Sequence, residues 1–441
     1  MPISLKPCAR ARTNPLPYAL LCIFLYGTAT MAIGREQPLS LAQAQHLAIV
    51  RSHQLAGQDS AISAAHQMAV AAGQLPDPVL KFGIDNLPVG GADRFSLSND
   101  FMTMRRLGVM QEITRSDKLK HRAAQFEITA QKTQAEKSLS IKGIQRDAAL
   151  AWLDRYYSER QLALVDAQLG QTQQEQQAAQ SAYTAGRASQ ADVLAAQSAV
   201  AMMEDRQIEL QARLSNAKTL LLRWVGDAAD TALADPPDLN KPALDSADLS
   251  QQTMQHMMQH PQLTMLAKQE QLAKVDASLA LANQKPDWSV EVSYQQRGAA
   301  YPNMMSVGVS LPWQWDQGKR QNRELSAKLA MAAQASAEQE EGLRVLLAET
   351  QTTLSEWRSK RKRLMRFQNK ILPLAQQRST AGMAAYRGGK LSLTELLATR
   401  RNETETRLQS LQLEADAAKL WAALQFLSPA SEFDVTHKDA K

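Results

Sequence analysis

The chain has 441 residues, of which 44% are hydrophobic, 21% charged and 5% aromatic. This composition excludes a disordered chain, a collagen and a small disulfide-bonded scaffold. The formal net charge is +6, but Lys6, Arg10 and Arg12 lie in the first 32 residues, which hold no acid, so the remainder carries only +3. A charge this small does not favour nucleic-acid binding, and we expect no nucleic-acid partner.

Residues 1–32 predict a secretory signal peptide. The three basic residues precede an apolar run over 19–26, and small residues follow up to Ala32, which is the order found in such signals. The run is shorter than the ~20 residues that a membrane-spanning helix needs. Cys8 and Cys22, the two cysteines of the chain, leave with this signal. We therefore expect an exported protein without disulfide bonds or thiol chemistry.

The rest of the chain is a tandem duplication of a unit of about 200 residues. The segment 182–195 returns at 385–398 with the shared pattern Tyr-x-x-Gly-x-x-Ser-x-x-Asp/Glu-x-Leu. Three shorter matches occur upstream in the same order. An internal repeat of this kind indicates that the same structural unit occurs twice in the fold. They pair 53–55 with 261–263, 75–77 with 285–287, and 107–109 with 307–309. We assign the first repeat to 33–235, a linker to 236–248, the second repeat to 249–428 and a tail to 429–441.

Each repeat predicts a helix, two strands and then long helices. Alanine and glutamine dominate a helical pattern that two prolines end, and period-2 alternation of apolar residues follows it. No proline occurs from 89 to 235, and apolar heptads in the long helices indicate lateral packing against other helices. The first repeat has helices at 39–75 and 116–225 and strands near 78–88 and 101–113; the second has strands near 287–297 and 304–315.

The four strands are too few to close a membrane barrel. Since the mature chain offers no run of 18 apolar residues, entry into a membrane would require a barrel shared between two or three chains. The alternative is a soluble four-stranded sheet that caps a coiled coil. The pattern alone leaves both open.

The duplicated order of helix, hairpin and long helices, joined at the Tyr-x-x-Gly-x-x-Ser turn, resembles the TolC family of outer-membrane efflux channels. Three further segments resemble the branch that serves heavy-metal pumps of the resistance-nodulation-division (RND) class. They are 73–78 (Gly-Gln-Leu-Pro-Asp-Pro), 85–88 (Asp-Asn-Leu-Pro) and 100–106 (Asp-Phe-Met-Thr-Met-Arg-Arg).

This resemblance implies a mainly α-helical protomer whose trimer forms a 12-stranded outer-membrane barrel and a periplasmic helical barrel. It implies a passive exit duct in a Gram-negative bacterium, working with a periplasmic membrane-fusion adaptor and an inner-membrane RND pump. Heavy-metal cations such as Cu(I) and Ag(I), or Co, Zn and Cd, are the expected cargo. Drug or protein export remains an alternative, as does a coiled-coil adaptor without a pore.

The main candidate site consists of the two predicted helix turns, one in the repeated segment 182–195 and one in 385–398. Glycine permits the reversal of two long helices, and a serine followed three residues later by an acid is a capping box. The resemblance adds that the tips meet the adaptor and that Asp192 and Glu395 line the pore entrance, where acids favour cations. Capping and pore lining are compatible. The adaptor-contacting candidates are Gly186, Arg187, Ser189, Gly389, Lys390 and Ser392.

A weaker candidate is a soft-metal site, because thioether and imidazole ligands suit Cu(I) or Ag(I). The alternative is that these methionines fill gaps between helices. The residues are Met254, His256, Met257, Met258 and His260. We expect no firm metal site and no cofactor.

Aromatic residues at the strand ends suit an interfacial belt, although strand packing explains them nearly as well. They are Trp288, Tyr294, Tyr301, Trp313 and Trp315. The sequence has no phosphate-binding loop, no HExxH metalloprotease motif and no GxSxG elbow. We therefore expect no enzymatic activity.

Overall fold

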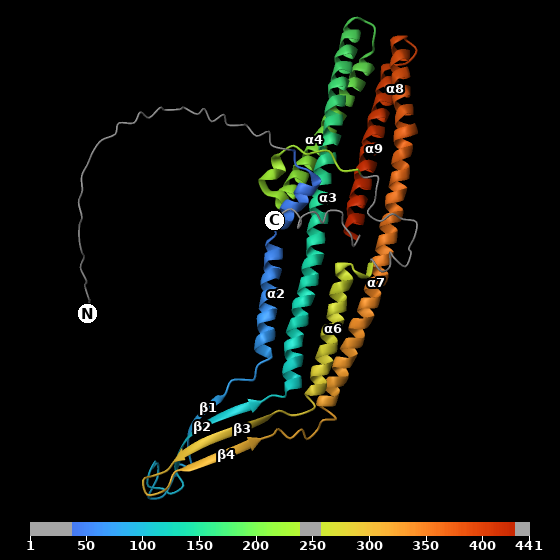
Figure 1. Ribbon diagram of the computed structural model, residues 1–441. Coiled ribbons are helices and arrows are strands. Elements are labelled where there is room, and N and C mark those ends of the chain that lie inside the picture. The colour runs from blue at the N-terminus through green and yellow to red at the C-terminus, as the bar shows by residue number, and fades with distance from the viewer. Residues whose placement is uncertain (1–37, 239–256, 428–441) are drawn as a thin grey trace, which may run out of the picture. The chain divides into compact units, whose positions relative to one another are not determined.

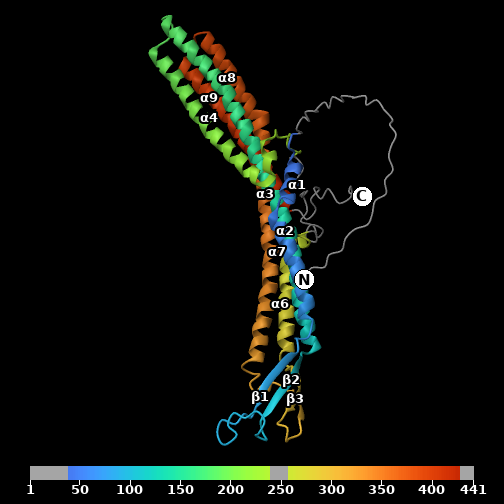
Figure 2. The ribbon, with the colours of Figure 1, turned by 90° about the vertical axis from the view of Figure 1, so that its left-hand side faces the viewer.

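The computed structural model describes residues 38–238 and 257–427, which belong to one of the two units of the chain, Pro38–Lys441. The expected signal peptide, most of the linker, the tail, Met254 and His256 lie outside the described residues. In the described part, the four strands lie at one end of the long helices, and two helical hairpins lie at the other (Figures 1 and 2).

The first helical segment consists of two helices, where the sequence predicted one over 39–75. Helix α1 spans Leu41–Val50 and α2 spans His53–Ala72. The break is at Ser52, whose side chain accepts a hydrogen bond from the Leu55 N–H (3.4 Å). Serine favours this N-cap geometry because its hydroxyl satisfies an amide that has no partner within the helix.

Long helices make up most of the fold. Helix α3 spans Ser116–Thr184, and its 69 residues correspond to about 100 Å at 1.5 Å per residue. It runs from the sheet to the first hairpin tip, and α4 (Gln190–Val225) returns from that tip. A short 3₁₀ turn, η1 (Gly226–Asp230), ends the helical part of the first repeat.

The second repeat divides the corresponding helices differently. Helix α6 spans Pro261–Ala282, α7 spans Gln321–Arg366, α8 spans Leu372–Arg387 and α9 spans Leu393–Leu427. A π-helical turn, η2 (Phe367–Ile371), joins α7 to α8 directly before Pro373. Proline has no N–H to donate into the helical ladder, so the hydrogen-bonding pattern changes at this point and the chain continues as a helix.

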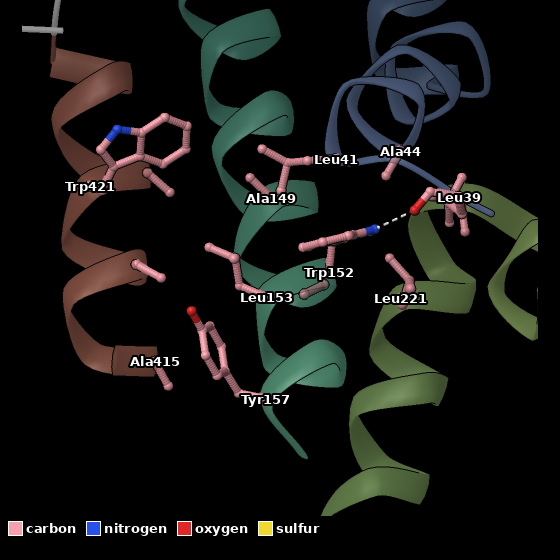
Figure 3. Packing of buried hydrophobic residues seen from close by; sticks show 14 of the residues in the cluster. Leu39, Leu41, Ala44, Ala149, Trp152, Leu153, Tyr157, Leu221, Ala415 and Trp421 are labelled. Atoms are coloured by element: carbon pink, nitrogen blue, oxygen red, sulfur yellow. Dashed lines mark hydrogen bonds between the residues drawn. The ribbon is translucent and has the colours of Figure 1, made fainter. Parts of the chain in front are cut away.

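The largest buried cluster lies halfway along α3 and joins both repeats (Figure 3). Trp152 of α3 is fully buried and its indole N–H donates to the Leu39 carbonyl (2.9 Å). Leu39 in turn pairs with the segment after η1, donating to the Ala232 carbonyl (2.8 Å). Helix α9 contributes Trp421 and the small Ala418, which permits close helix approach. The start of the described chain is thereby fixed to the middle of the helical part.

The four strands form one antiparallel sheet in the order β1-β2-β3-β4. In its central row Leu80 lies opposite Val109, Val109 opposite Val292, and Val292 opposite Val307. The β2–β3 pairing joins the two repeats, while β1 and β4 are the edges. The strands are β1 (Val79–Asp85), β2 (Met104–Ile113), β3 (Trp288–Gln296) and β4 (Met304–Ser310).

The register sorts the side chains by polarity onto the two faces of the sheet. One face carries an apolar row on every strand, and these side chains are exposed, with Phe82 at 74% and Val307 at 68%. The opposite face carries an ion-pair network. Within the described residues no helix covers the apolar face, which is the reverse of the arrangement in a water-soluble sheet.

The network on the polar face links three strands. Glu291 of β3 contacts Lys81 of β1 (2.6 Å) and Arg106 of β2 (3.6 Å), and Arg106 also contacts Asp85 of β1 (3.2 Å). This network was not predicted from the sequence. The available signal was the charge at alternate positions of β1, Lys81 and Asp85, between apolar residues.

Strand β4 ends at Ser310, whereas the sequence predicted a strand near 304–315. The reason is Pro312, which cannot donate to a strand ladder. Trp313 and Trp315 therefore lie beyond the strand and are 80% and 89% exposed.

Candidate functional site

Both hairpin tips use the same backbone turn. Gly186 and Gly389 have φ angles of +72° and +70°, a conformation that costs other L-residues free energy. At the first tip the Arg187 N–H donates to the Ala182 carbonyl (2.8 Å), and the Gly186 N–H donates to the Tyr183 carbonyl (2.9 Å). This is a Schellman motif. The second tip repeats it with 2.9 Å and 3.0 Å bonds from the Lys390 and Gly389 N–H groups.

A capping box begins the returning helix at each tip. The Asp192 N–H donates to the Ser189 hydroxyl oxygen (3.2 Å), and the Ser189 N–H donates to the Asp192 carboxylate (3.0 Å). Ser392 and Glu395 exchange the equivalent bonds at 3.3 Å and 3.0 Å. Each carboxylate thus satisfies an amide at a helix N-terminus, which is the capping role that the spacing predicted.

The same hydrogen bonds keep both acids ionised. The Ser189 hydroxyl, together with the backbone N–H of that residue, lowers the pKa of the Asp192 carboxyl below its usual value. The Ser392 backbone N–H and then its hydroxyl lower the pKa of Glu395. A carboxylate near a helix N-terminus is also favoured by the helix dipole. Each tip therefore carries a fixed negative charge at neutral pH.

The two hairpins contact each other behind the tips. A buried cluster joins Ala179 and Ala196 of the first hairpin to Leu393, Leu396 and Leu397 of the second. Further from the tips, Arg400 of α9 forms an ion pair with Glu175 of α3 (3.2 Å). Burial raises the pKa of Glu175, and the Arg400 guanidinium opposes that rise. A cavity of about 250 Å³ lies between the hairpins at this pair.

The other tip candidates lie at the surface. Gly186, Arg187 and Ser189 are exposed at the first tip, and Gly389, Lys390 and Ser392 are exposed at the second. A single chain cannot place these residues around a pore, so their function remains a proposal.

Three residues of the methionine and histidine cluster, Met257, Met258 and His260, lie within the described part of the chain. Met257 and His260 are fully buried, while Met258 is exposed. His260 is the N-cap of α6: its Nδ1 accepts from the Gln262 N–H (3.3 Å), and its Nε2 lies 3.4 Å from the Phe426 carbonyl oxygen. Within 38–238 and 257–427 no three His, Cys, Asp or Glu side chains are grouped as metal ligands would be.

The aromatic candidates lie at both ends of the sheet. Trp288 begins β3 on the helix side, where Trp313 and Trp315 also follow β4. Tyr294 lies near the far end of β3, and Tyr301 lies in the following loop, where the Arg297 guanidinium stacks on its ring (4.9 Å). The candidates therefore lie at two levels, one at each end of the sheet. Among the described helices, none has both the length and the apolarity needed to span a membrane.

No model of a known protein family matches the sequence, and no curated protein matches it. Solved structures are nevertheless similar over nearly the whole chain. The channel-forming protein CusC has 16% identity and a TM-score of 0.73, with 88% of this chain and 92% of that chain covered. The outer-membrane channel OprN has 16% identity and a TM-score of 0.74, covering 89% and 90%. The outer membrane protein VceC of Vibrio cholerae has 17% identity and a TM-score of 0.70, covering 88% and 95%.

These similarities establish the fold. The chain is mainly helical with a small four-stranded sheet, and its architecture is that of the TolC-like outer-membrane efflux channels. Such channels are passive conduits rather than enzymes.

Proposed function

We propose that this chain is one protomer of a homotrimeric outer-membrane channel, the exit duct of a tripartite RND-type efflux system. The observation that carries the proposal is the exposed apolar face of the sheet, with Leu80, Val109, Val292 and Val307 in one row across all four strands. Lipid is the environment in which such a face is stable. A coiled-coil adaptor without a pore offers no reason for it.

The open edges of the sheet support the oligomeric part of the proposal. Strands β1 and β4 each have one side without a partner strand in the described chain. An unpaired edge in lipid costs several kcal/mol for each unsatisfied group. Three copies supply 12 strands, which is within the range of closed membrane barrels, and the ion-pair network then faces the polar interior.

The tips provide the periplasmic entrance in this proposal. The two hairpins of each chain end far from the sheet, so three copies bring six tips together. Asp192 and Glu395 would form rings of negative charge at the constriction. The exposed tip residues Arg187 and Lys390 would contact the periplasmic adaptor, which in turn joins the duct to the inner-membrane pump.

The proposed cargo is heavy-metal cations. Three sequence segments that resemble the heavy-metal branch of the family support this choice, as do the ionised Asp192 and Glu395 at the tips. A duct should pass its cargo without holding it, so the burial of Met257 and His260 is compatible with the proposal.

The first experiment is membrane fractionation followed by gel electrophoresis with and without heating. The protein should be found in the outer membrane and migrate as a heat-sensitive trimer. A water-soluble periplasmic product, or a detergent-stable monomer that conducts ions, would contradict the proposal.

The second experiment concerns the cargo. Cells that lack the protein should become sensitive to copper, silver, cobalt, zinc or cadmium salts while drug tolerance stays unchanged. Sensitivity to drugs alone would leave the channel assignment intact but replace the cargo.

A further inference from the structure

The β2–β3 pairing is an internal template for the contact between two copies of the chain. The residues of β1 and β3 correspond at an offset of 210, and those of β2 and β4 at an offset of 200. The register obeys these offsets: Leu80 lies opposite Val109, and Val290 lies opposite Val309. Helices α2 and α6 also end at equivalent residues, Ala72 and Ala282.

The same offsets predict how β4 meets β1 of a second copy. In the template Val109 lies opposite Val292 and Gly108 opposite Ser293. Transfer of this register places Val309 opposite Phe82 of the second copy, and Gly308 opposite Gly83. Both pairs match in polarity, because Val309 and Phe82 belong to the apolar face while the two glycines lie on the polar face. A shift by one residue would place apolar side chains on the wrong face.

An ion pair accompanies the template where the strands join the helices. Asp287, directly before β3, accepts from the Arg115 N–H (3.0 Å) and from Lys118 Nζ (2.8 Å). Lys118 lies in the first turn of α3, and its side chain is only 5% exposed. The first repeat thus holds the second through a nearly buried salt bridge.

The equivalent groups at the open edges are exposed. Asp77 corresponds to Asp287 at the offset of 210. Lys118 is the third residue of α3 and Arg323 is the third residue of α7, so these two correspond by their position in the helix, at an offset of 205. In the described part of the chain neither Asp77 nor Arg323 forms an ion pair, and both are exposed. The Arg320 N–H, the equivalent of the Arg115 N–H, already donates to the Asp316 carbonyl (3.2 Å). Lys319 and Arg320, just before α7, are exposed as well, but Arg323 has the same position in α7 as Lys118 has in α3, so its side chain is the equivalent partner for Asp77.

We infer that Asp77 of one copy forms an ion pair with Arg323 of the next, beside a β4–β1 junction in which Val309 lies opposite Phe82. The inference rests on the proposed trimer and adds the register and the charged contact that fix it. In such a trimer, first and second repeats alternate around the whole barrel. Asp77 then pairs with a cation of the neighbouring copy in the way that Asp287 pairs with Lys118 within one chain.

Disulfide crosslinking tests the register. Directly opposed residues have the Cα spacing that a disulfide requires, and the described chain contains no cysteine. The double variant Phe82→Cys with Val309→Cys should give a covalent trimer on a non-reducing gel that disappears on reduction. Phe82→Cys with Val307→Cys, shifted by two residues on the same face of β4, should not. Crosslinking of the shifted pair in preference to the first would overturn the register.

Charge reversal tests the ion pair. Asp77→Arg should lower the temperature at which the trimer band is lost, and Asp77→Arg with Arg323→Asp should recover most of that shift. Asp93→Arg, an exposed acid in the β1–β2 loop, serves as the matched control and should leave the temperature unchanged. A double variant no more stable than Asp77→Arg alone would overturn the pairing. A wild-type protein that is monomeric in the outer membrane would instead overturn the proposed function.

Discussion

At the scale of single residues, the tip acids serve two roles that one side chain can combine. Asp192 and Glu395 are fully used as helix caps, since each exchanges hydrogen bonds with its serine in both directions. A cap requires an acceptor oxygen, whereas an ion filter requires a net charge. The two roles are therefore separable by substitution.

The double variant Asp192→Asn with Glu395→Gln keeps an acceptor at each cap and removes the charge. We expect an intact trimer whose cation preference is lost, because low-dielectric walls focus the field of the carboxylates on passing ions. Reversal potentials in planar bilayers measure this, and Ser189→Ala with Ser392→Ala is the control that weakens the caps and keeps the acids. Unchanged selectivity in the Asn/Gln variant would leave the acids with a structural role alone.

His260 predicts a pH dependence of stability. Burial, followed by the nearby positive charge of Lys142, lowers the pKa of His260 from 6.5 to about 4; Arg146 also faces this region, stacked on the Phe426 ring. The unfolded chain binds the proton first as the pH falls, so stability is complete above pH 6.5 and decreases towards pH 4. The expected loss is about 3 kcal/mol at 1.36 kcal/mol per pKa unit.

The measurement is thermal unfolding of wild type and His260→Asn at pH 7 and pH 4.5. Asparagine retains an acceptor for the Gln262 N–H but does not titrate, so its stability should change less between the two pH values. His46→Asn, at an exposed position of α1, should behave as wild type does. Equal pH dependence in all three proteins would show that His260 does not titrate in this range.

At the scale of elements, the long helices owe their separation into hairpins to two glycines. Crowding by neighbouring atoms does not explain why glycine occupies the tips, because no such atom lies within 4 Å of the position that a Cβ on Gly186 or Gly389 would take. Their requirement for glycine therefore comes from the backbone angle alone. This makes the cost of substitution at the tips predictable.

Gly186→Ala and Gly389→Ala should each destabilise the hairpins by roughly 1–2 kcal/mol, the cost of the left-handed conformation for an L-residue. Asparagine at the same positions should cost less. Gly170 in the interior of α3 also has open space around its Cβ position, but it is helical, so Gly170→Ala should stabilise by about 0.5–1 kcal/mol. Denaturant unfolding compares the three; destabilisation by Gly170→Ala would contradict the backbone argument.

At the scale of the whole molecule, the sheet determines the environment of one end of the protein. Within the described residues, no layer of helices packs on the apolar face of the sheet, so the sheet has no hydrophobic core of its own there. In the proposed assembly, lipid supplies the burial that stabilises this face. The buried cluster around Trp152 belongs to the helical part instead.

Substitutions at two adjacent residues of β4 test which face of the sheet contacts lipid. Val307 lies on the exposed apolar face and Gly308 on the polar face, with open space at its Cβ position. Val307→Arg should reduce outer-membrane trimer strongly, because a cation on the lipid side costs about 2–4 kcal/mol near the bilayer midplane. Gly308→Arg should assemble. Equal trimer levels in outer-membrane fractions would show that the faces are wrongly assigned.

Much of the local structure could be predicted from the sequence, because its causes lie within a few residues. Alternation of apolar residues indicated strands near the observed ones, and the Gly-x-x-Ser-x-x-Asp/Glu pattern predicted both tip turns and their caps. The errors were local as well: the break at Ser52 was missed, and the last strand was extended past Pro312. In each case one side chain outweighed a periodicity that continued beyond it.

What the sequence by itself determined is the duplicated plan, since repeated segments encode repeated hydrogen-bonding patterns whatever surrounds them. Only the tertiary structure decided that β2 pairs with β3 across the two repeats, that the apolar face of the sheet is uncovered, and that His260 is buried beside Phe426. The contacts of the sheet join residues up to 210 positions apart, with 187 positions between Leu107 and Tyr294 and 210 between Lys81 and Glu291. No local pattern specifies such partners, because their free energy arises only once both segments have been brought together.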